Sequence, residues 1–142
     1  MTVAVRYQSR KGNTRKIAQA IAEAIGVEAL PITEPLDGPV DLLFVGGALY
    51  AGGIEPKLEE FLKQLPADKI GKVAVFSTSV SPKTPLEQVK GILEGKGIAI
   101  MGKSFHSPGS FLFFNRKRPN TQDCEQAAAF AKQITESMKE VM

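Results

Sequence analysis

The segment SRKGNT, residues 9–14, gathers hydrogen-bond donors and positive charge into one short turn. These donors and cations are Ser9, Arg10, Lys11, Asn13 and Thr14. The stretch before the turn alternates like a strand and the stretch after it has helical spacing, so we expect a helix to begin beside the turn. The first N–H groups of a helix and the positive end of its dipole attract anions, and Gly12 lets the backbone approach a ligand closely. Since no acidic residue precedes Glu23, the sequence predicts a bound anion such as a phosphate.

Two other kinds of phosphate loop do not fit this turn. It lacks the second glycine and the Gly-Lys-Ser/Thr ending of a nucleotide-triphosphate loop. It also lacks the three glycines of the dinucleotide fingerprint. A plainer interpretation stays open, in which Asn13 or Thr14 only caps the helix and the arginines and lysines are solvated.

Strand-like and helical segments alternate along the rest of the chain. We expect strands at residues 3–7, 27–32, 42–47, 72–79 and 97–105, and helices at residues 13–25, 55–66, 85–94 and 121–141. This alternation predicts an α/β fold, a doubly wound five-stranded parallel sheet with helices on both faces. The connection TEPLDGPV, residues 33–40, is too short for a crossover helix, and we predict a loop there. Ligands of such folds bind at the carboxyl ends of the strands.

The last predicted helix has a clear beginning and a clear apolar face. Asn120 or Thr121 can cap it, and Asp123 suits its positive end. Its apolar face consists of Ala127, Phe130, Ala131, Ile134, Met138 and Val141. Cys124 also lies on this helix, where a buried structural role is favoured over catalysis.

Size and composition limit what the protein can be. The 142 residues suffice for one ordinary domain, which we expect to span residues 1–142, and 43% apolar with 23% charged residues is typical of a soluble globular protein. No apolar run approaches the roughly 20 residues of a membrane span, and no signal-peptide pattern is present, so we expect a cytoplasmic protein. One cysteine allows neither an internal disulfide nor a multi-cysteine metal site, and we expect no metal. The basic residues do not form a long basic helix with interleaved aromatics, so nucleic-acid binding is not expected.

The turn at residues 9–14 resembles the phosphate loop of the flavodoxin family. That pattern is a hydroxyl residue, any residue, Thr or Ser, Gly, any residue and Thr, and it is matched by Ser9, Gly12, Asn13 and Thr14. Lys11 departs from it, because it places a cation where a hydroxyl is usual. Two later segments are also similar to ligand loops of the family: GGALYAGGIEPKLEEFL after the third strand and FSTSVSPKTP after the fourth. The resemblance covers nearly the whole chain and implies the strand order 2-1-3-4-5.

The resemblance implies that the ligand is FMN, with its phosphate at residues 9–14 and its ring between the second and third loops. The implied second-loop residues are Ala48, Leu49, Tyr50, Ala51, Gly52 and Gly53, and the implied third-loop residues are Thr78, Ser79, Val80 and Ser81. Tyr50 would stack on the ring, and the peptide between Gly52 and Gly53 could turn over when the flavin N5 gains a proton. The third loop would offer backbone groups to the pyrimidine edge, and it lacks the aromatic residue that many flavodoxins place there.

By this resemblance the protein is expected to be an electron carrier between redox partners rather than an independent oxidoreductase, and no catalytic residue is assigned. The alternatives are a reductase or oxidase of the same fold that acts on a quinone or a porphyrinogen, and a partner-docking module without flavin. GNTRKIAQAI and LYAGG resemble the protoporphyrinogen-oxidase branch.

Charge is the second departure from electron-shuttling flavodoxins, which are typically acidic. The net charge here is +3 and the sequence pI is about 9.0. The cluster Arg116, Lys117 and Arg118 and the apolar run 111–114 are expected near the ligand end, where a basic rim would attract acidic partners. The alternative is that the aromatics pack inward and the cations are solvated. For the single histidine, His106, an ordinary role at a strand end is favoured over a proton relay.

Overall fold

A parallel sheet forms the centre of the computed structural model, which describes residues 1–36, 38–50, 53–79, 83–110 and 117–141. Its strands lie in the order β2-β1-β3-β5-β6, with β7 also paired to β5. Their bounds are β1 Val3–Tyr7, β2 Ala29–Pro31, β3 Val40–Tyr50, β5 Ile70–Ser79, β6 Ala99–Ile100 and β7 Phe105–Pro108. This order confirms the predicted arrangement, in which the second strand lies at one edge and the first strand lies inside.

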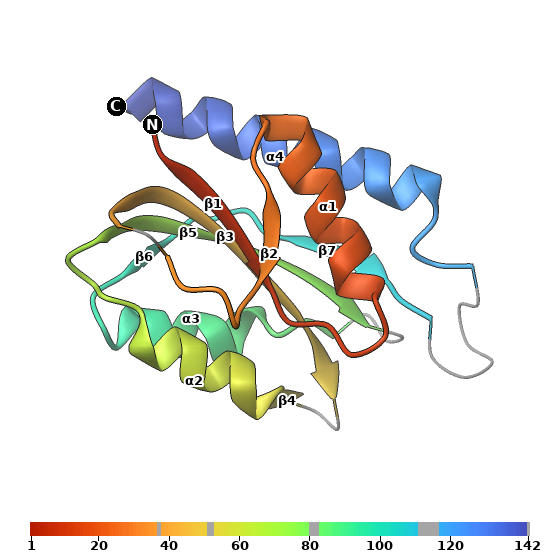
Figure 1. Ribbon diagram of the computed structural model, residues 1–142, viewed down its shortest axis with the longest axis horizontal. Coiled ribbons are helices and arrows are strands. Elements are labelled where there is room, and N and C mark those ends of the chain that lie inside the picture. The colour runs from red at the N-terminus through yellow and green to blue at the C-terminus, as the bar shows by residue number, and fades with distance from the viewer. Residues whose placement is uncertain (37, 51–52, 80–82, 111–116, 142) are drawn as a thin grey trace.

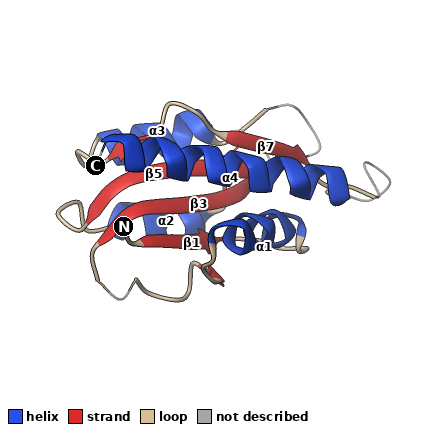
Figure 2. Ribbon diagram, turned by 90° about the horizontal axis from the view of Figure 1, so that it is seen from above, coloured by secondary structure: helices blue, strands red, loops and turns tan. Residues whose placement is uncertain are grey.

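Helices cover both faces of the sheet (Figure 1). Their bounds are α1 Asn13–Ile25, α2 Pro56–Gln64, α3 Leu86–Glu94 and α4 Thr121–Val141. Helices α1 and α4 lie on one face, and α2 and α3 on the other, as the view from above also shows (Figure 2). Both views place the two termini at the end of the sheet away from the carboxyl end of β3.

Alternation along the central strands builds two hydrophobic cores. In β3, Leu42 and Phe44 pack toward α1 and α4, whereas Leu43 and Val45 pack toward α2 and α3. Both sets are at most 1% exposed, as expected for a parallel sheet that is buried on both faces. The predicted face of α4 is buried from Ala127 to Met138, but Val141 is 72% exposed, so its inclusion in that face was wrong. Helix α4 therefore packs against the core only as far as Met138.

The connection between β2 and β3 contains no helix among its described residues, as predicted. Arg6 of β1, only 6% exposed, holds this loop in place. Its Nε and Nη2 donate to the carbonyl oxygens of Glu34 and Pro35 at 3.0 and 2.9 Å. The guanidinium therefore anchors a loop where other doubly wound folds have a crossover helix.

The fifth strand was predicted as one continuous segment at residues 97–105, but the structure divides it into β6 and β7. β6 pairs with Lys72 and Val73, and β7 pairs with residues 76–79, so two short strands share one neighbour. Between them Gly102 and Lys103 are exposed and leave the ladder. Glycine and lysine are both depleted in strands, which accounts for the interruption.

Glycine at position 46 is required by packing against β5. Gly46 lies opposite Phe76 in the parallel ladder, and a Cβ atom built on it would lie 2.1 Å from Cε2 of the Phe76 ring. Phe76 is fully buried, so the ring has no room to move aside. The absence of a side chain at Gly46 thus lets an aromatic residue fill the core beside the carboxyl end of β3.

We predict that Gly46→Ala lowers the free energy of unfolding by roughly 1–3 kcal/mol, because the added methyl group overpacks the core. Gly91→Ala is the matched control, since Gly91 lies in α3 with nothing within 4 Å of the added Cβ. It should raise the free energy of unfolding by roughly 0.5–1 kcal/mol. Urea denaturation measures both changes. Equal stability of the two variants would contradict the packing role of Gly46.

Candidate functional site

The turn at residues 9–14 connects the carboxyl end of β1 to the first turn of α1. Gly12 is the N-cap residue and has φ 92°, a left-handed conformation that side-chain-bearing residues rarely adopt. The backbone N–H of Gly12 donates to Ser9 Oγ at 2.9 Å, which closes the turn. No side chain among the described residues caps α1, and its first turn contains no acid. The first N–H groups of α1 therefore face the ligand end of the sheet without a side-chain cap.

The cations of this turn have different surroundings. Arg10 pairs with Glu55, the N-cap residue of α2, with 2.5 Å between Nη2 and Oε2. This ion pair joins the first turn to the segment that follows the second loop. Lys11, Arg15 and Lys16 are exposed. The surface around the beginning of α1 is therefore positively charged.

Asn13 and Thr14 do not cap α1, so the capping role that the plainer interpretation gave them was wrong. Asn13 Nδ2 donates to the carbonyl oxygen of Ser110 at 2.8 Å, and Ser110 Oγ donates to Asn13 Oδ1 at 3.0 Å. Asn13 thereby ties the first turn to the segment that follows β7. Gly109 lies against the same amide, because a Cβ atom there would be 3.1 Å from Asn13 Nδ2.

Thr14 joins the first and third predicted ligand loops. Its Oγ1 lies 2.8 Å from Thr78 Oγ1, and both residues are 1% exposed. Thr78 is also paired in the ladder with Ala48, which is 8% exposed. The structure thus brings one predicted residue from each of the three loops together at the carboxyl ends of the central strands.

The second predicted loop is shorter than expected, because β3 continues to Tyr50. Tyr50 pairs with Gly53 and Leu49 pairs with Ile54, so β3 and the antiparallel β4 (Gly53–Ile54) form a hairpin. Ala48, Leu49 and Tyr50 were predicted in a loop and instead end the strand. Leu49 packs against the core on the α2 and α3 face. Ala51, Gly52 and the side chain of Tyr50 lie outside the described part of the structure.

A glutamine of α3 fixes this hairpin. The N–H of Ile54 donates to Gln88 Oε1 at 3.0 Å. Gly53 is not among the described glycines with positive φ, and a Cβ atom there would lie 3.6 Å from the same Gln88 oxygen. Gln88 was not among the predicted site residues, because nothing in the sequence connects a helix residue to a loop 34 positions earlier.

The third predicted loop begins on β5, where Ser79 is held from several sides. Its carbonyl oxygen accepts a hydrogen bond from Gly109 N–H at 3.0 Å. Its Oγ donates to the carbonyl oxygen of Lys83 at 3.0 Å and lies 3.3 Å from His106 Nε2. Val80 and Ser81 lie outside the described residues. His106 was expected to be an ordinary strand-end residue, yet it contacts a predicted ligand-loop residue.

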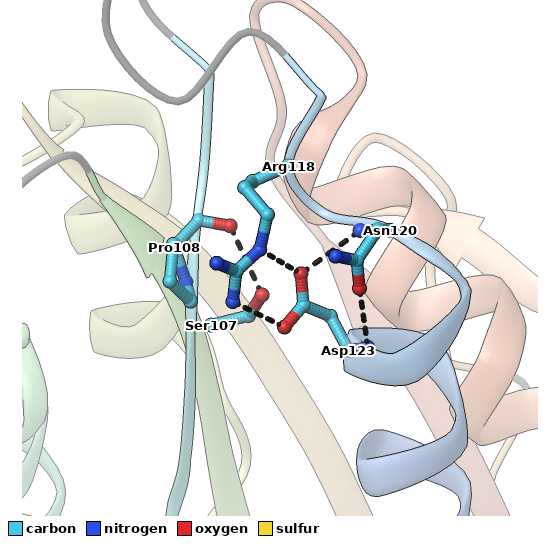
Figure 3. Close-up of polar contacts among 5 residues, drawn as sticks. All are labelled: Ser107, Pro108, Arg118, Asn120 and Asp123. Carbon is cyan, nitrogen blue, oxygen red and sulfur yellow. Dashed lines mark hydrogen bonds and ion pairs between the residues drawn. The ribbon is translucent and has the colours of Figure 1, made fainter.

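The predicted basic cluster near residue 117 is divided. Arg116 and the apolar run 111–114 lie outside the described residues, and Lys117 is exposed. Arg118 is bound to Asp123 of α4, with Nε and Nη2 donating to the two carboxylate oxygens at 2.6 and 2.7 Å (Figure 3). Arg118 therefore fixes the beginning of α4, and its charge is paired with a carboxylate rather than only solvated.

Asp123 and Asn120 together form a capping box at the start of α4. Asn120 Oδ1 accepts from Asp123 N–H at 2.9 Å, and Asp123 Oδ2 accepts from Asn120 N–H at 2.8 Å. The predicted Asn120 cap is thus confirmed. The hydrogen bond from Arg118 is the main reason that the pKa of Asp123 lies below its ordinary value, and the Asn120 N–H acts in the same direction.

Other groups near the site are a thiol and a buried amide oxygen. Cys124 is half-buried and packs against the core, and burial raises the pKa of its thiol. This agrees with the structural role predicted for it. Gln8, which precedes the first turn, has a buried Oε1 that finds no hydrogen-bond partner among the described residues. The described residues contain no cluster of His, Cys, Asp and Glu that could hold a metal. Within the same residues, no helix has the length and apolarity needed to cross a membrane.

Comparisons with known proteins agree with this geometry. A family model described as a flavodoxin domain matches residues 4–103. No curated protein matches the chain. A flavodoxin from the domain Archaea is 18% identical, with a TM-score of 0.72, covering 98% of this chain and 99% of its own. Flavodoxin 2 from Bacillus cereus is also 18% identical, with a TM-score of 0.72, covering 96% and 99%.

A longer protein also contains this fold. Rubredoxin oxygen:oxidoreductase from Desulfovibrio gigas is 20% identical, with a TM-score of 0.75, and the match covers 98% of this chain but 36% of that one. The TM-scores show that the fold is shared, and at these low identities the comparison says nothing about the chemistry of the site.

The capping box predicts a pH-dependent stability. Asp123→Asn should lower the free energy of unfolding by about 1–2 kcal/mol at neutral pH, because it weakens a cap and an ion pair. A carboxyl whose folded pKa is depressed contributes stability above its unfolded pKa, and this contribution is lost as pH falls through the folded pKa. The difference between wild type and variant should therefore shrink below about pH 4.

Denaturation curves at several pH values measure this difference. Glu136→Gln removes the same charge from the exposed side of α4 and should change stability by less than about 0.5 kcal/mol. A deficit of Asp123→Asn that stays constant down to about pH 2 would show that the carboxylate charge contributes nothing.

Proposed function

Because the chain belongs to the flavodoxin family, we propose that it binds FMN and carries electrons between redox partners. The observation that carries the proposal is the first turn of α1 at the carboxyl end of β1. There Gly12 begins the helix in a left-handed conformation, and no described side chain caps the first N–H groups. Such a helix start binds a phosphate through backbone donors and the helix dipole.

The residues around this helix start fit a phosphate dianion. Ser9 Oγ already receives the Gly12 N–H, so its own hydroxyl hydrogen can be donated outward. Arg10 forms an ion pair with Glu55, so the charge of this carboxylate is balanced where it contacts the turn. Lys11 adds an exposed cation. These features support a site that favours negative charge, and a side-chain carboxylate of the first turn does not compete for it.

The ring of the flavin would lie between the ends of β3 and β5, where Ala48 and Thr78 are neighbours. The predicted ring residues are still Tyr50, Gly52 and Gly53 in the second loop and residues 78–81 in the third. Bound FMN would supply one- and two-electron redox chemistry. The protein itself would fix the second loop through Gln88 and the third loop through Ser79. Backbone groups of these loops would then meet the ring in a set geometry.

The charge of the surface favours acidic redox partners. Lys11, Arg15 and Lys16 are exposed around the beginning of α1, and the chain has a net charge of +3. A partner with a negative surface would be attracted toward this edge of the sheet, where the flavin is expected.

The phosphate site predicts that charge reversal affects FMN more than riboflavin, which has the same ring but no phosphate. Lys11→Glu should weaken FMN binding about tenfold and leave riboflavin binding nearly unchanged, because the new carboxylate repels only the phosphate. Lys69→Glu is the control, since Lys69 is exposed and lies just before the amino-terminal end of β5, opposite the carboxyl end where the flavin is expected. Quenching of flavin fluorescence measures both affinities. Equal losses for the two ligands would place the phosphate elsewhere, and no binding by wild type would favour the docking module.

The positive surface predicts opposite salt effects for oppositely charged oxidants. The flavin-loaded, reduced protein should transfer electrons to ferricyanide at least about threefold more slowly as ionic strength rises, because screening removes the attraction. Transfer to hexaammineruthenium(III) should become faster. Stopped-flow absorbance under anaerobic conditions measures both rates, and Arg15→Glu should reduce both effects. The same salt dependence for the two oxidants would contradict steering by this surface.

A further inference from the structure

His106 of β7 lies between two serines of β5, in a position that the flavin-site prediction does not use. Its Nδ1 lies 2.8 Å from Ser77 Oγ, and its Nε2 lies 3.3 Å from Ser79 Oγ. Ser77 is opposite His106 in the β5–β7 ladder and is 2% exposed. Ser79 Oγ continues the series to the carbonyl oxygen of Lys83. We name these four residues the serine–histidine relay.

The last bond of the relay determines the direction of the others. A carbonyl oxygen can only accept, so Ser79 must donate its single hydroxyl hydrogen to Lys83. Toward His106, Ser79 Oγ can then only accept, and the hydrogen must be on His106 Nε2. A neutral imidazole carries one N–H, which leaves Nδ1 as an acceptor for the Ser77 hydroxyl. Every hydrogen bond of the relay thus points from the buried Ser77 toward Lys83.

The serine–histidine relay connects the residues on either side of the third ligand loop. Ser79 precedes residues 80–82, and Lys83 follows them. The Ser79 hydroxyl joins these two ends, and His106 fixes the orientation of that hydroxyl. The Ser79 backbone is held separately by Gly109 N–H, so the side chain and the main chain of Ser79 are both anchored to the β7 segment.

We propose that His106, as its neutral Nε2–H tautomer, is a positioning residue of the ring-binding loop that orients Ser79 through the Nε2–H donor. This inference rests on the proposed function, because the loop is expected to contact the flavin ring. It gives His106 no role in phosphate binding, since the relay makes its contacts on β5, on β7 and at Lys83.

The tautomer can be tested without any ligand. His106 is the single histidine of the chain, so tag-free protein labelled with ¹⁵N-histidine gives one imidazole spin system. At neutral pH its two-bond ¹⁵N–¹H spectrum should show a protonated Nε2 and an unprotonated Nδ1. Ser79→Ala removes the acceptor and should bring the two nitrogen shifts closer together through tautomer exchange. A protonated Nδ1 in wild type would overturn the direction of the relay.

Two conservative variants separate the two nitrogens of His106. His106→Gln places an amide near the position of Nε2 and can keep the donor to Ser79. His106→Asn places its amide near Nδ1, so it can keep only the contact with Ser77. FMN and riboflavin binding should both weaken about tenfold in His106→Asn, as expected for one lost positioning hydrogen bond, and by less than about threefold in His106→Gln.

The same titrations distinguish the failure of this inference from that of the proposed function. Thermal denaturation curves first establish that His106→Asn and wild type are both folded. Equal flavin affinities of the two proteins would then overturn the positioning role alone. A loss confined to FMN would also overturn it, because the relay would then act through the phosphate. Absence of flavin binding by wild type would overturn the proposed function and the ligand role of the relay together, while the tautomer spectrum would still test its geometry.

Discussion

The position of the α1 amino terminus is the constraint on which the site depends. A parallel sheet directs the end of β1 and the start of the following helix to the same edge, so the positive end of α1 cannot be turned away from the ligand end. Gly12 makes the tight entry possible, and Ser9 closes it with one hydrogen bond. With no acid in the first turn, the electrostatic preference for an anion comes from the fold and from the adjacent cations together.

Hydrogen bonds between loops far apart in sequence give this edge its order. Asn13 binds Ser110, Thr14 meets Thr78, and the β7 segment holds Ser79 through Gly109 and His106. The site is thus fixed mainly by short polar side chains and backbone groups. A ligand that meets such an arrangement loses less free energy to the ordering of loops than one that must organise them, and this is an advantage for a protein expected to hold its cofactor while partners change.

The sequence predicted what depends on local periodicity and turn chemistry. The alternation of segments, the Gly12 and Gly26 helix boundaries and the Asn120 cap followed from patterns within short windows. The order of the strands followed from the resemblance to the flavodoxin family. The contacts of Asn13 and Thr14 could not be predicted, because their partners lie 97 and 64 residues away. Arg118 was misjudged for another reason, since its partner Asp123 is only 5 residues away: its charge was assigned to a basic rim together with its neighbours. The split of the fifth strand depended on Gly102 and Lys103, whose weak strand preference was outweighed in the prediction by the apolar residues on either side.

The most direct test of the account is the ³¹P NMR signal of FMN in the presence of a slight excess of protein, followed with pH. The phosphate of free FMN loses its second proton near about pH 6. If it is bound as a dianion by the first turn of α1, its chemical shift should differ from that of free FMN and stay constant between about pH 5 and 8. A signal from bound FMN that titrates like the free phosphate would show that this turn does not hold the phosphate, and would contradict the account.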